Sequence, residues 1–233
     1  MKVNFRMKFQ WLIFAICATC IWVSGAQGQA IVDVKSTPVV SGSMSNEGDW
    51  IEQQAHTSLF RFRVKAISTD GDHFAVSAIE ISNSRGKPVQ LISNVGGQPV
   101  TAKADRLLQV IDVNFDGHDD IAVLAADGGA GPNSTSYFYL FESRQKKFKL
   151  EKKLSSLPQV SINPDHTITS AYRDGCCSHG SKTYRYLAGR LTLVSSRDES
   201  LTSDGQTIET TVGQLVRGKI RYTVTREKAP EDN

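Results

Sequence analysis

The stretch LFRFRVKAI at residues 59–67, followed by TDGD and then HFAVSAIEI at residues 73–81, decides the fold class. In the first run apolar residues alternate with polar ones, and the second run is rich in apolar residues. A period of two places apolar side chains on one face of a strand and polar ones on the other. The Asp-Gly pair between the runs is typical of a tight turn. The stretch therefore predicts an antiparallel β-hairpin with one buried face.

Similar short apolar runs, separated by Asp-Gly, Gly-Gly, Asn-Pro and Arg-Gly turn signals, continue to the end of the chain. No segment shows the 3.6-residue apolar period and the caps of a helix. We expect an all-β protein of antiparallel hairpins in a single domain, arranged as a β-sandwich or as a propeller-like array. The further predicted strands are residues 89–93, 107–113, 121–126, 136–143, 147–154, 167–173, 182–188, 190–196, 206–216 and 219–227.

Residues 1–30 have the composition of a secretory signal peptide, with a basic start, an apolar core at residues 11–23 and small residues after it. That core is too short for a comfortable membrane span, so we expect a periplasmic or secreted protein without a stable membrane anchor. Residues 31–57 are predicted to be a flexible lead-in, residues 58–227 the β domain, and residues 228–233 a disordered tail.

The charge balance excludes one class of partner. Removing residues 1–30 removes three basic residues and no acidic one, so 27 basic against 24 acidic residues become 24 against 24. A neutral mature chain lacks the basic surplus of a nucleic-acid-binding protein. No G-x-S-x-G motif occurs and the five histidines are scattered among turns, so we do not expect an enzyme.

The segment DVNFDGHDD at residues 112–120 predicts a Ca²⁺ site. Side-chain oxygens at positions 1, 3 and 5 with glycine at position 6 let a tight turn direct several oxygens at one ion. An Asx-rich turn is the alternative, but it does not explain carboxylates at alternate positions, where they repel one another. Strand patterns flank the loop and position 12 is valine, so it is no EF-hand and the ion would be structural. The predicted ligands are Asp112, Asn114, Asp116, the backbone carbonyl of His118, and Asp120.

The features that follow this loop give the chain a resemblance to a known group. A strand leads to the small-residue segment DGGAGPNSTSY at residues 127–137, and later to NPDHTITSAYRDGCCSHGSKTYRY. This order, within about residues 59–195, resembles bacterial periplasmic proteins that include the periplasmic inhibitor of i-type lysozyme. The group also includes calcium-binding immunity proteins that block a lysozyme-like effector of type IV secretion systems. The resemblance implies an inhibitor whose partner is a peptidoglycan hydrolase.

The inhibitors of this group insert a Ser-Gly-x-Tyr loop into the cleft of the hydrolase. Ser134 and Tyr137 match that spacing, with Thr135 in place of the glycine. The resemblance implies that Ser134 hydrogen-bonds a catalytic carboxylate and that Tyr137 fills a sugar subsite. The alternative from the residues alone is that Tyr137 begins a strand and packs inward.

A second segment, YRDGCCSHG at residues 172–180, carries adjacent cysteines. Cys176 and Cys177 would form a vicinal disulfide, which we favour, form a disulfide with another molecule, or stay buried and reduced. With either disulfide, Tyr172 and His179 would flank the same partner-binding edge as Tyr137.

Three functions follow from these observations. The first is a periplasmic inhibitor, of the immunity type, of a peptidoglycan hydrolase, with a structural Ca²⁺ ion that braces the inhibitory loop. The second is a calcium-stabilised adhesion or ligand-binding module of the FG-GAP type. The third is a structural envelope protein. The sequence assigns no oligomeric state.

Overall fold

The computed structural model describes residues 48–128, 133–175 and 177–230. Its strands follow the alternation of apolar residues: β2 (Phe60–Ser68) buries Phe62, Val64 and Ala66 and turns the residues between them away. The other strands are β1 (Asp49–His56), β3 (His73–Asn83), β4 (Pro88–Ser93), β5 (Val100–Thr101), β6 (Leu108–Ile111), β7 (Asp120–Ala126), β8 (Thr135–Glu142), β9 (Lys147–Leu150), β10 (Val160–Ile162), β11 (Ile168–Asp174), β12 (Ser178–Leu187), β13 (Arg190–Leu201), β14 (Thr207–Val216) and β15 (Lys219–Lys228).

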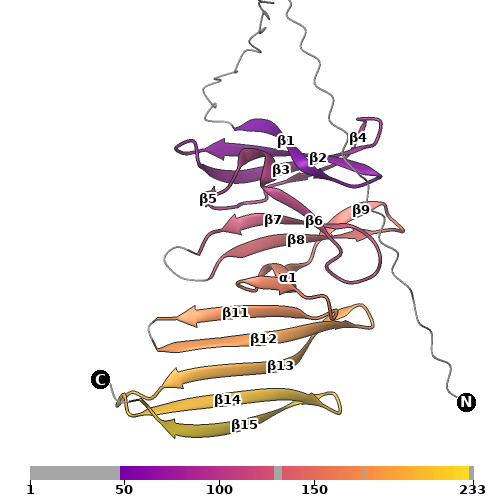
Figure 1. Ribbon diagram of the computed structural model, residues 1–233. Helices are drawn as coiled ribbons and strands as arrows, with labels where there is room; N and C mark the ends of the chain where they lie inside the picture. Colours follow the sequence, from indigo (N-terminus) through magenta and orange to yellow (C-terminus); the bar gives the residue numbers. More distant parts are fainter. Residues whose placement is uncertain (1–47, 129–132, 176, 231–233) are drawn as a thin grey trace, which may run out of the picture. The chain divides into compact units, whose positions relative to one another are not determined.

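The strands form three antiparallel sheets, and nearly every strand pairs with its neighbour in the sequence (Figure 1). The first sheet has the order β1-β2-β3-β4, with β5 also paired to β3. The second has the order β6-β7-β8-β9, and the third runs in sequence order from β10 to β15. Short turns suffice for such connections because antiparallel neighbours need no crossover.

Two apolar clusters hold the sheets together. The first combines residues of the first two sheets, among them Phe62, Ile79, Ile121 and Phe148, and its phenylalanine rings meet at 5.2–5.9 Å between centroids. The second joins the middle sheet to the third through residues that include Phe138 and Ile168. The prediction of an all-β antiparallel protein is confirmed, and sheets that share clusters in this way pack as in a sandwich.

The structure differs from expectation at residues 49–56, which form β1 instead of a flexible lead-in. The polar composition of this segment conceals its role. Gln53 is buried, its amide donates to Ala104 O at 2.9 Å, and its carbonyl accepts from Leu108 N at 3.1 Å. The amide and the carbonyl of this buried glutamine both have partners, and they join β1 to residue 104 and to the first residue of β6. The alternation of apolar residues does not reveal this link.

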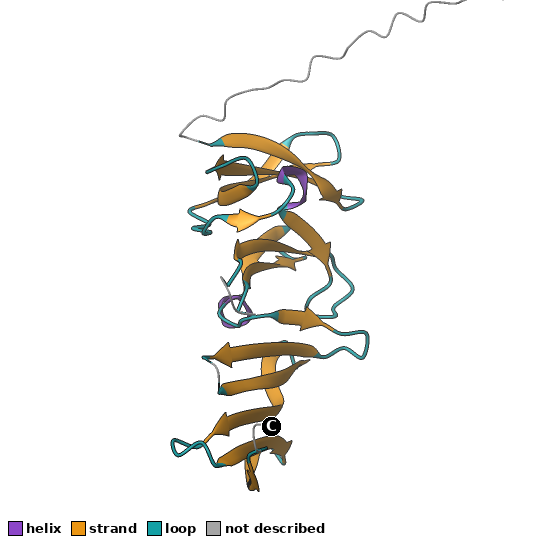
Figure 2. Cartoon of the chain, turned by 60° about the vertical axis from the view of Figure 1, so that its left-hand side comes forward, coloured by secondary structure: helices purple, strands orange, loops and turns teal. Residues whose placement is uncertain are grey.

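The expected strand at residues 147–154 is also shorter than predicted. It ends as β9 at Leu150, and residues 152–155 form the helix α1 (Lys152–Ser155), which with the 3₁₀-helix η1 (Ala104–Arg106) is drawn purple in Figure 2. The turn of α1 places Leu154, fully buried, in the second apolar cluster. Burial of a leucine stabilises this turn by about 1.5–3 kcal/mol.

The predicted signal peptide and residues 31–47 lie outside the described residues, as do residues 231–233 of the predicted tail. Of the tail, Lys228 is the last residue of β15. Within the described part of the chain, no helix is long and apolar enough to cross a membrane.

Candidate functional site

The acidic loop connects β6 to β7 and turns its side-chain oxygens inward. The Asp112 carboxylate accepts hydrogen bonds from Asp116 N at 3.2 Å and Gly117 N at 2.9 Å. Asn114 Oδ1 accepts from Asp116 N at 3.1 Å, and Asp116 Oδ1 accepts from His118 N at 2.9 Å. Gly117 has a φ of +83°, a left-handed conformation that glycine adopts without steric cost.

Asp120 differs from the other acidic residues because it is fully buried. Its two carboxylate oxygens accept from Val113 N at 3.0 Å and from Phe141 N at 2.7 Å. Burial raises the pKa of Asp120 to about 6, the two backbone hydrogen bonds oppose that rise, and the charges of Asp116 and Asp112 add to it. Asp120 therefore ties the end of the loop to β8.

The donors of this loop fit calcium by type. Among the described residues, no three His, Cys, Asp or Glu side chains converge as a metal site. In the loop, two carboxylates and one amide, from Asp112, Asp116 and Asn114, already point inward. Hydrogen bonds to backbone N–H groups orient their oxygens and leave a second lone pair on each. An all-oxygen donor set is the set that Ca²⁺ prefers.

The acidic loop precedes β7, and the segment that begins at Asp127 follows the other end of this strand (Figure 1). At 3.3 Å per residue, this seven-residue strand separates them by about 20 Å. The loop instead contacts the turn between β10 and β11, where the rings of Phe115 and His166 stack at 4.8 Å. A metal in the loop would thus brace the segment only through β7, which corresponds to the strand that the sequence predicts at residues 121–126.

Asn133, in the segment at residues 127–137, bonds to the C-terminal end of β11. Asn133 Nδ2 donates to Arg173 O at 2.8 Å, and Arg173 N donates to Asn133 Oδ1 at 3.1 Å. Ser134 O accepts from Gln159 N at 2.7 Å, and residues 129–132 lie outside the described residues. The two segments that the sequence selects for partner binding are therefore joined by a reciprocal pair of hydrogen bonds.

Tyr137 does not project from this segment. It is half-buried, packs against the first apolar cluster, and donates its hydroxyl to Gly96 O at 3.3 Å. This is the inward alternative for Tyr137, and it ties the chain between β4 and β5 to β8. Ser134, at the segment's end, is partly exposed.

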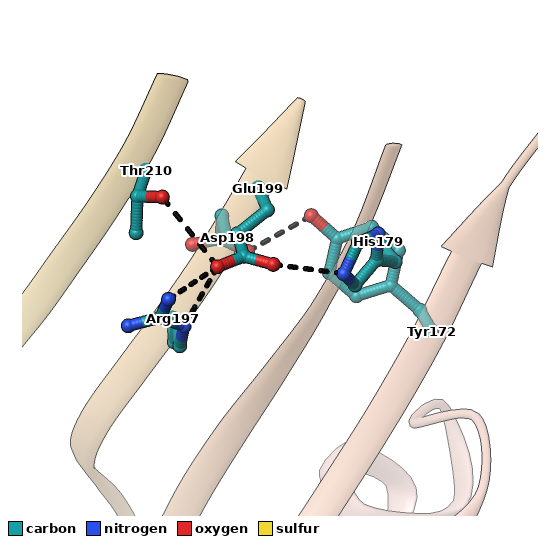
Figure 3. A network of polar contacts seen from close by, with 6 residues as sticks. All are labelled: Tyr172, His179, Arg197, Asp198, Glu199 and Thr210. Carbon is teal, nitrogen blue, oxygen red and sulfur yellow. Dashed lines mark hydrogen bonds and ion pairs between the residues drawn. The ribbon is translucent and has the colours of Figure 1, made fainter. Parts of the chain in front are cut away.

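Tyr172 and His179 lie on opposite faces of the third sheet. Tyr172 pairs in register with Gly180, which is adjacent to His179, and successive residues of a strand face opposite sides. A Cβ on Gly180 would lie 2.7 Å from the Tyr172 ring, so only glycine lets the ring cross that strand. The Tyr172 hydroxyl then donates to Asp198 Oδ1 at 2.8 Å, and this bond raises the pKa of Tyr172 (Figure 3).

On the other face of the sheet, the Glu199 carboxylate contacts three neighbouring side chains (Figure 3). It pairs with Arg197 and, at 2.9 Å, with His179 Nε2, and it accepts from the Thr210 hydroxyl at 3.5 Å. The hydrogen bond from Arg197 is the main reason that the pKa of Glu199 is lowered, and His179 adds to the effect. The predicted edge therefore carries Tyr172 and His179 on different surfaces.

A hollow of about 370 Å³ lies on the His179 face, lined by Arg173, Cys177, Glu199, Ile208 and Pro230 among others. Cys177 is disulfide-bonded, and Cys176 lies outside the described residues.

Sequence reasoning missed Asn133, Asp198 and Glu199 as parts of this site. For Asp198, the signal would be a hairpin register that sets Tyr172 opposite Gly180, and the sequence between β11 and β12 does not fix that register.

The fold and these loops define an all-β protein of consecutive antiparallel meanders. No protein-family model matches the sequence, and no curated protein sequence matches it. Among solved structures, the chain is similar to a Xanthomonas type IV secretion system related protein, with a TM-score of 0.54 and 19% sequence identity. The likeness covers 76% of this chain and 94% of that one. At this identity the likeness is one of fold.

Proposed function

We propose that the protein is a periplasmic inhibitor, of the immunity type, of a lysozyme-like peptidoglycan hydrolase, and that it acts by binding and not by catalysis. The observation that carries the proposal is the Asn133–Arg173 pair, which joins the Ser134 segment to the end of β11, within the segment at residues 172–180. These are the two segments that the resemblance to lysozyme inhibitors selects. The fold likeness to a type IV secretion system related protein is compatible with such a role.

In this proposal the contact surface is the joined edge, on which His179 is exposed and Ser134 is partly exposed. Tyr137 anchors the end of the segment through its hydrogen bond to Gly96 O and does not fill a sugar subsite of the hydrolase. Tyr172 fixes the turn through Asp198. An edge that is hydrogen-bonded before binding loses little conformational entropy when a partner binds.

Calcium would be held by the side chains of Asp112, Asn114 and Asp116 and the carbonyl of His118, with Asp120 as the brace behind them. The cation would neutralise the carboxylates that the turn crowds together. This predicts a higher melting temperature with Ca²⁺ than with a chelator, and loss of that difference after Asp112→Ala with Asp116→Ala, because a ligand that binds only the native state stabilises it. Equal melting temperatures of the unmutated protein in both conditions would remove the metal from the proposal.

The test of function is inhibition of cell-wall lysis by residues 31–233 with Ca²⁺ present, measured against a panel of lysozyme-like and chitinase-like hydrolases. We expect inhibition of at least one enzyme. Asn133→Ala should weaken it at least tenfold, because it frees the segment from Arg173. Asn163→Ala is the matched control, since the Asn163 side chain likewise makes two hydrogen bonds, in its case as the donor to Thr167 and Thr169 at the other end of β11.

Failure to inhibit any enzyme of the panel would overturn the inhibitor function and favour the calcium-stabilised adhesion module. Inhibition that Asn133→Ala leaves unchanged would keep the function and overturn the edge as its site.

A further inference from the structure

The hairpin of β14 and β15 extends the third sheet beyond the apolar clusters. Neither cluster includes a residue of these two strands. On β15, the side chains of Tyr222 and Val224 are 63% and 51% exposed. The Tyr222 ring lies against Gly213, where a Cβ would be 2.9 Å from it, and this contact accounts for part of its position. Val224 has no such neighbour, so the outer strand presents apolar side chains to solvent.

The hydrogen-bonding groups of β15 can be assigned from its register. β15 pairs with β14 alone among the described strands. Ala229 lies directly opposite Gln206 in the continued register of β14 and β15, and Ala229 N donates to Gln206 O at 2.8 Å. These two residues therefore form a hydrogen-bonded pair of the ladder. Such pairs alternate along an antiparallel ladder, so odd-numbered residues of β15 bond to β14. The amides and carbonyls of Tyr222 and Val224 therefore face the free edge of the sheet.

Basic residues greatly outnumber acidic ones on β15. It carries Lys219, Arg221, Arg226 and Lys228 against Glu227, a net charge of +3. Arg226 is paired with Glu209 at 2.7 Å. The side chains of Lys219 and Arg221 have no hydrogen bond or ion pair within the described part of the chain. A second copy of β15 would bring cations against cations, and like charges on adjacent strands are destabilising.

We propose that the free edge of β15 binds an extended, acidic segment of a partner protein, which adds to the sheet as a further strand. Backbone hydrogen bonds from Tyr222 and Val224 would supply affinity, and carboxylates of the partner would meet Lys219 and Arg221. This surface is separate from the Asn133–Arg173 edge, so the inference goes beyond the proposed inhibitor function.

The competing explanation is that the cations only prevent edge-to-edge association, as lysines on edge strands do in many proteins. That explanation predicts no strand addition by peptides of either charge.

The experiment uses fluorescence anisotropy of a labelled ten-residue peptide of alternating glutamate and valine, blocked at both ends. The control is its counterpart with lysine in place of glutamate. We expect the acidic peptide to bind at least tenfold more tightly than the basic one at low salt, and high salt to reduce that preference. Lys219→Glu with Arg221→Glu should reverse it.

The matched variants are Val224→Pro and Val224→Thr. Proline removes the outward N–H and should reduce binding at least tenfold, whereas threonine keeps the N–H and should bind nearly as the unmutated protein does. Because the Val224 amide does not bond to β14, both variants should fold, which circular dichroism checks. Inhibition of the hydrolase should be unaffected by either variant, so failure of one proposal is distinguishable from failure of the other.

Equal binding of the two peptides, absence of binding, or unchanged affinity of Val224→Pro would overturn the inference. So would a dimer in sedimentation that Val224→Pro dissociates, since it would assign the edge to a second copy of the chain.

Discussion

The stability of the calcium-free protein should rise as the pH falls from 7 to 5, because of Asp120. This carboxyl is fully buried, and its pKa is about 6 in the folded protein against an ordinary value of 3.8. Between these two values the folded state binds more protons than the unfolded chain, so lowering the pH favours the folded state. The two pKa values give a gain of about 1.4 kcal/mol between pH 7 and pH 5.

The measurement is urea unfolding in the presence of a chelator at pH 7 and pH 5, for the unmutated protein and for Asp120→Asn. Asparagine has the same shape and does not titrate in this range, so groups common to both proteins cancel in the comparison. We expect the gain to be smaller in Asp120→Asn by about 1.4 kcal/mol. Identical pH dependence of the two proteins would refute the idea that the burial of Asp120 opposes its ionisation.

Calcium should reverse the sign of this effect. If the acidic loop binds Ca²⁺, protons compete with the ion for the loop carboxylates, and stability with Ca²⁺ present should fall as the pH is lowered.

Substitutions at three positions, two of them with a control variant, test the packing. Gly180→Ala should lower the free energy of unfolding by about 1–3 kcal/mol in thermal melts, because the new methyl group meets the Tyr172 ring. Ser181→Ala, on the opposite face, should change it by less than about 0.5 kcal/mol. Equal effects of the two substitutions would contradict the clash. Gln53→Leu should cost about 2–4 kcal/mol in urea unfolding, since it leaves two backbone groups without a partner; an unchanged midpoint would mean that water replaces the amide. Tyr137→Ala should cost about 2–4 kcal/mol and Tyr137→Phe less than about 1 kcal/mol, and a protein that tolerates both equally would show that Tyr137 does not pack as described.

Alternation of apolar residues predicted most of the strands, as the burial of Phe62, Val64 and Ala66 illustrates. Alternation failed at β1, where the buried residue that fixes the strand is the polar Gln53. It failed again at Leu154, which is buried from the helix α1 and not from a strand. The two failures have different causes. The sequence pattern does not record that the polar side chain of Gln53 finds partners outside its own sheet, and it marks Leu154 as apolar without fixing the backbone conformation that buries it.

The sequence located the acidic loop correctly between two strands. The roles of individual site residues depended on strand faces and strand register, which the alternation of apolar residues does not define. Residues 136–141 are nearly all large, so neither face of β8 is marked as the inner one, and the direction of Tyr137 could not be read from the sequence. Placing Tyr172 and His179 on opposite faces required the register of β11 against β12.

The order of the strands has a consequence for how the chain folds. Each sheet is completed by consecutive strands, so β1 to β5 can pair before β6 to β9 exist, and those before β10 to β15. Hairpins close short loops, which costs little entropy and makes their formation fast for a β protein. A chain that leaves the ribosome or a transport channel from its N-terminus can therefore add each sheet to the preceding one. The long-range hydrogen bonds of Gln53 and Gln90 then join the first sheet to the second only once the second has formed.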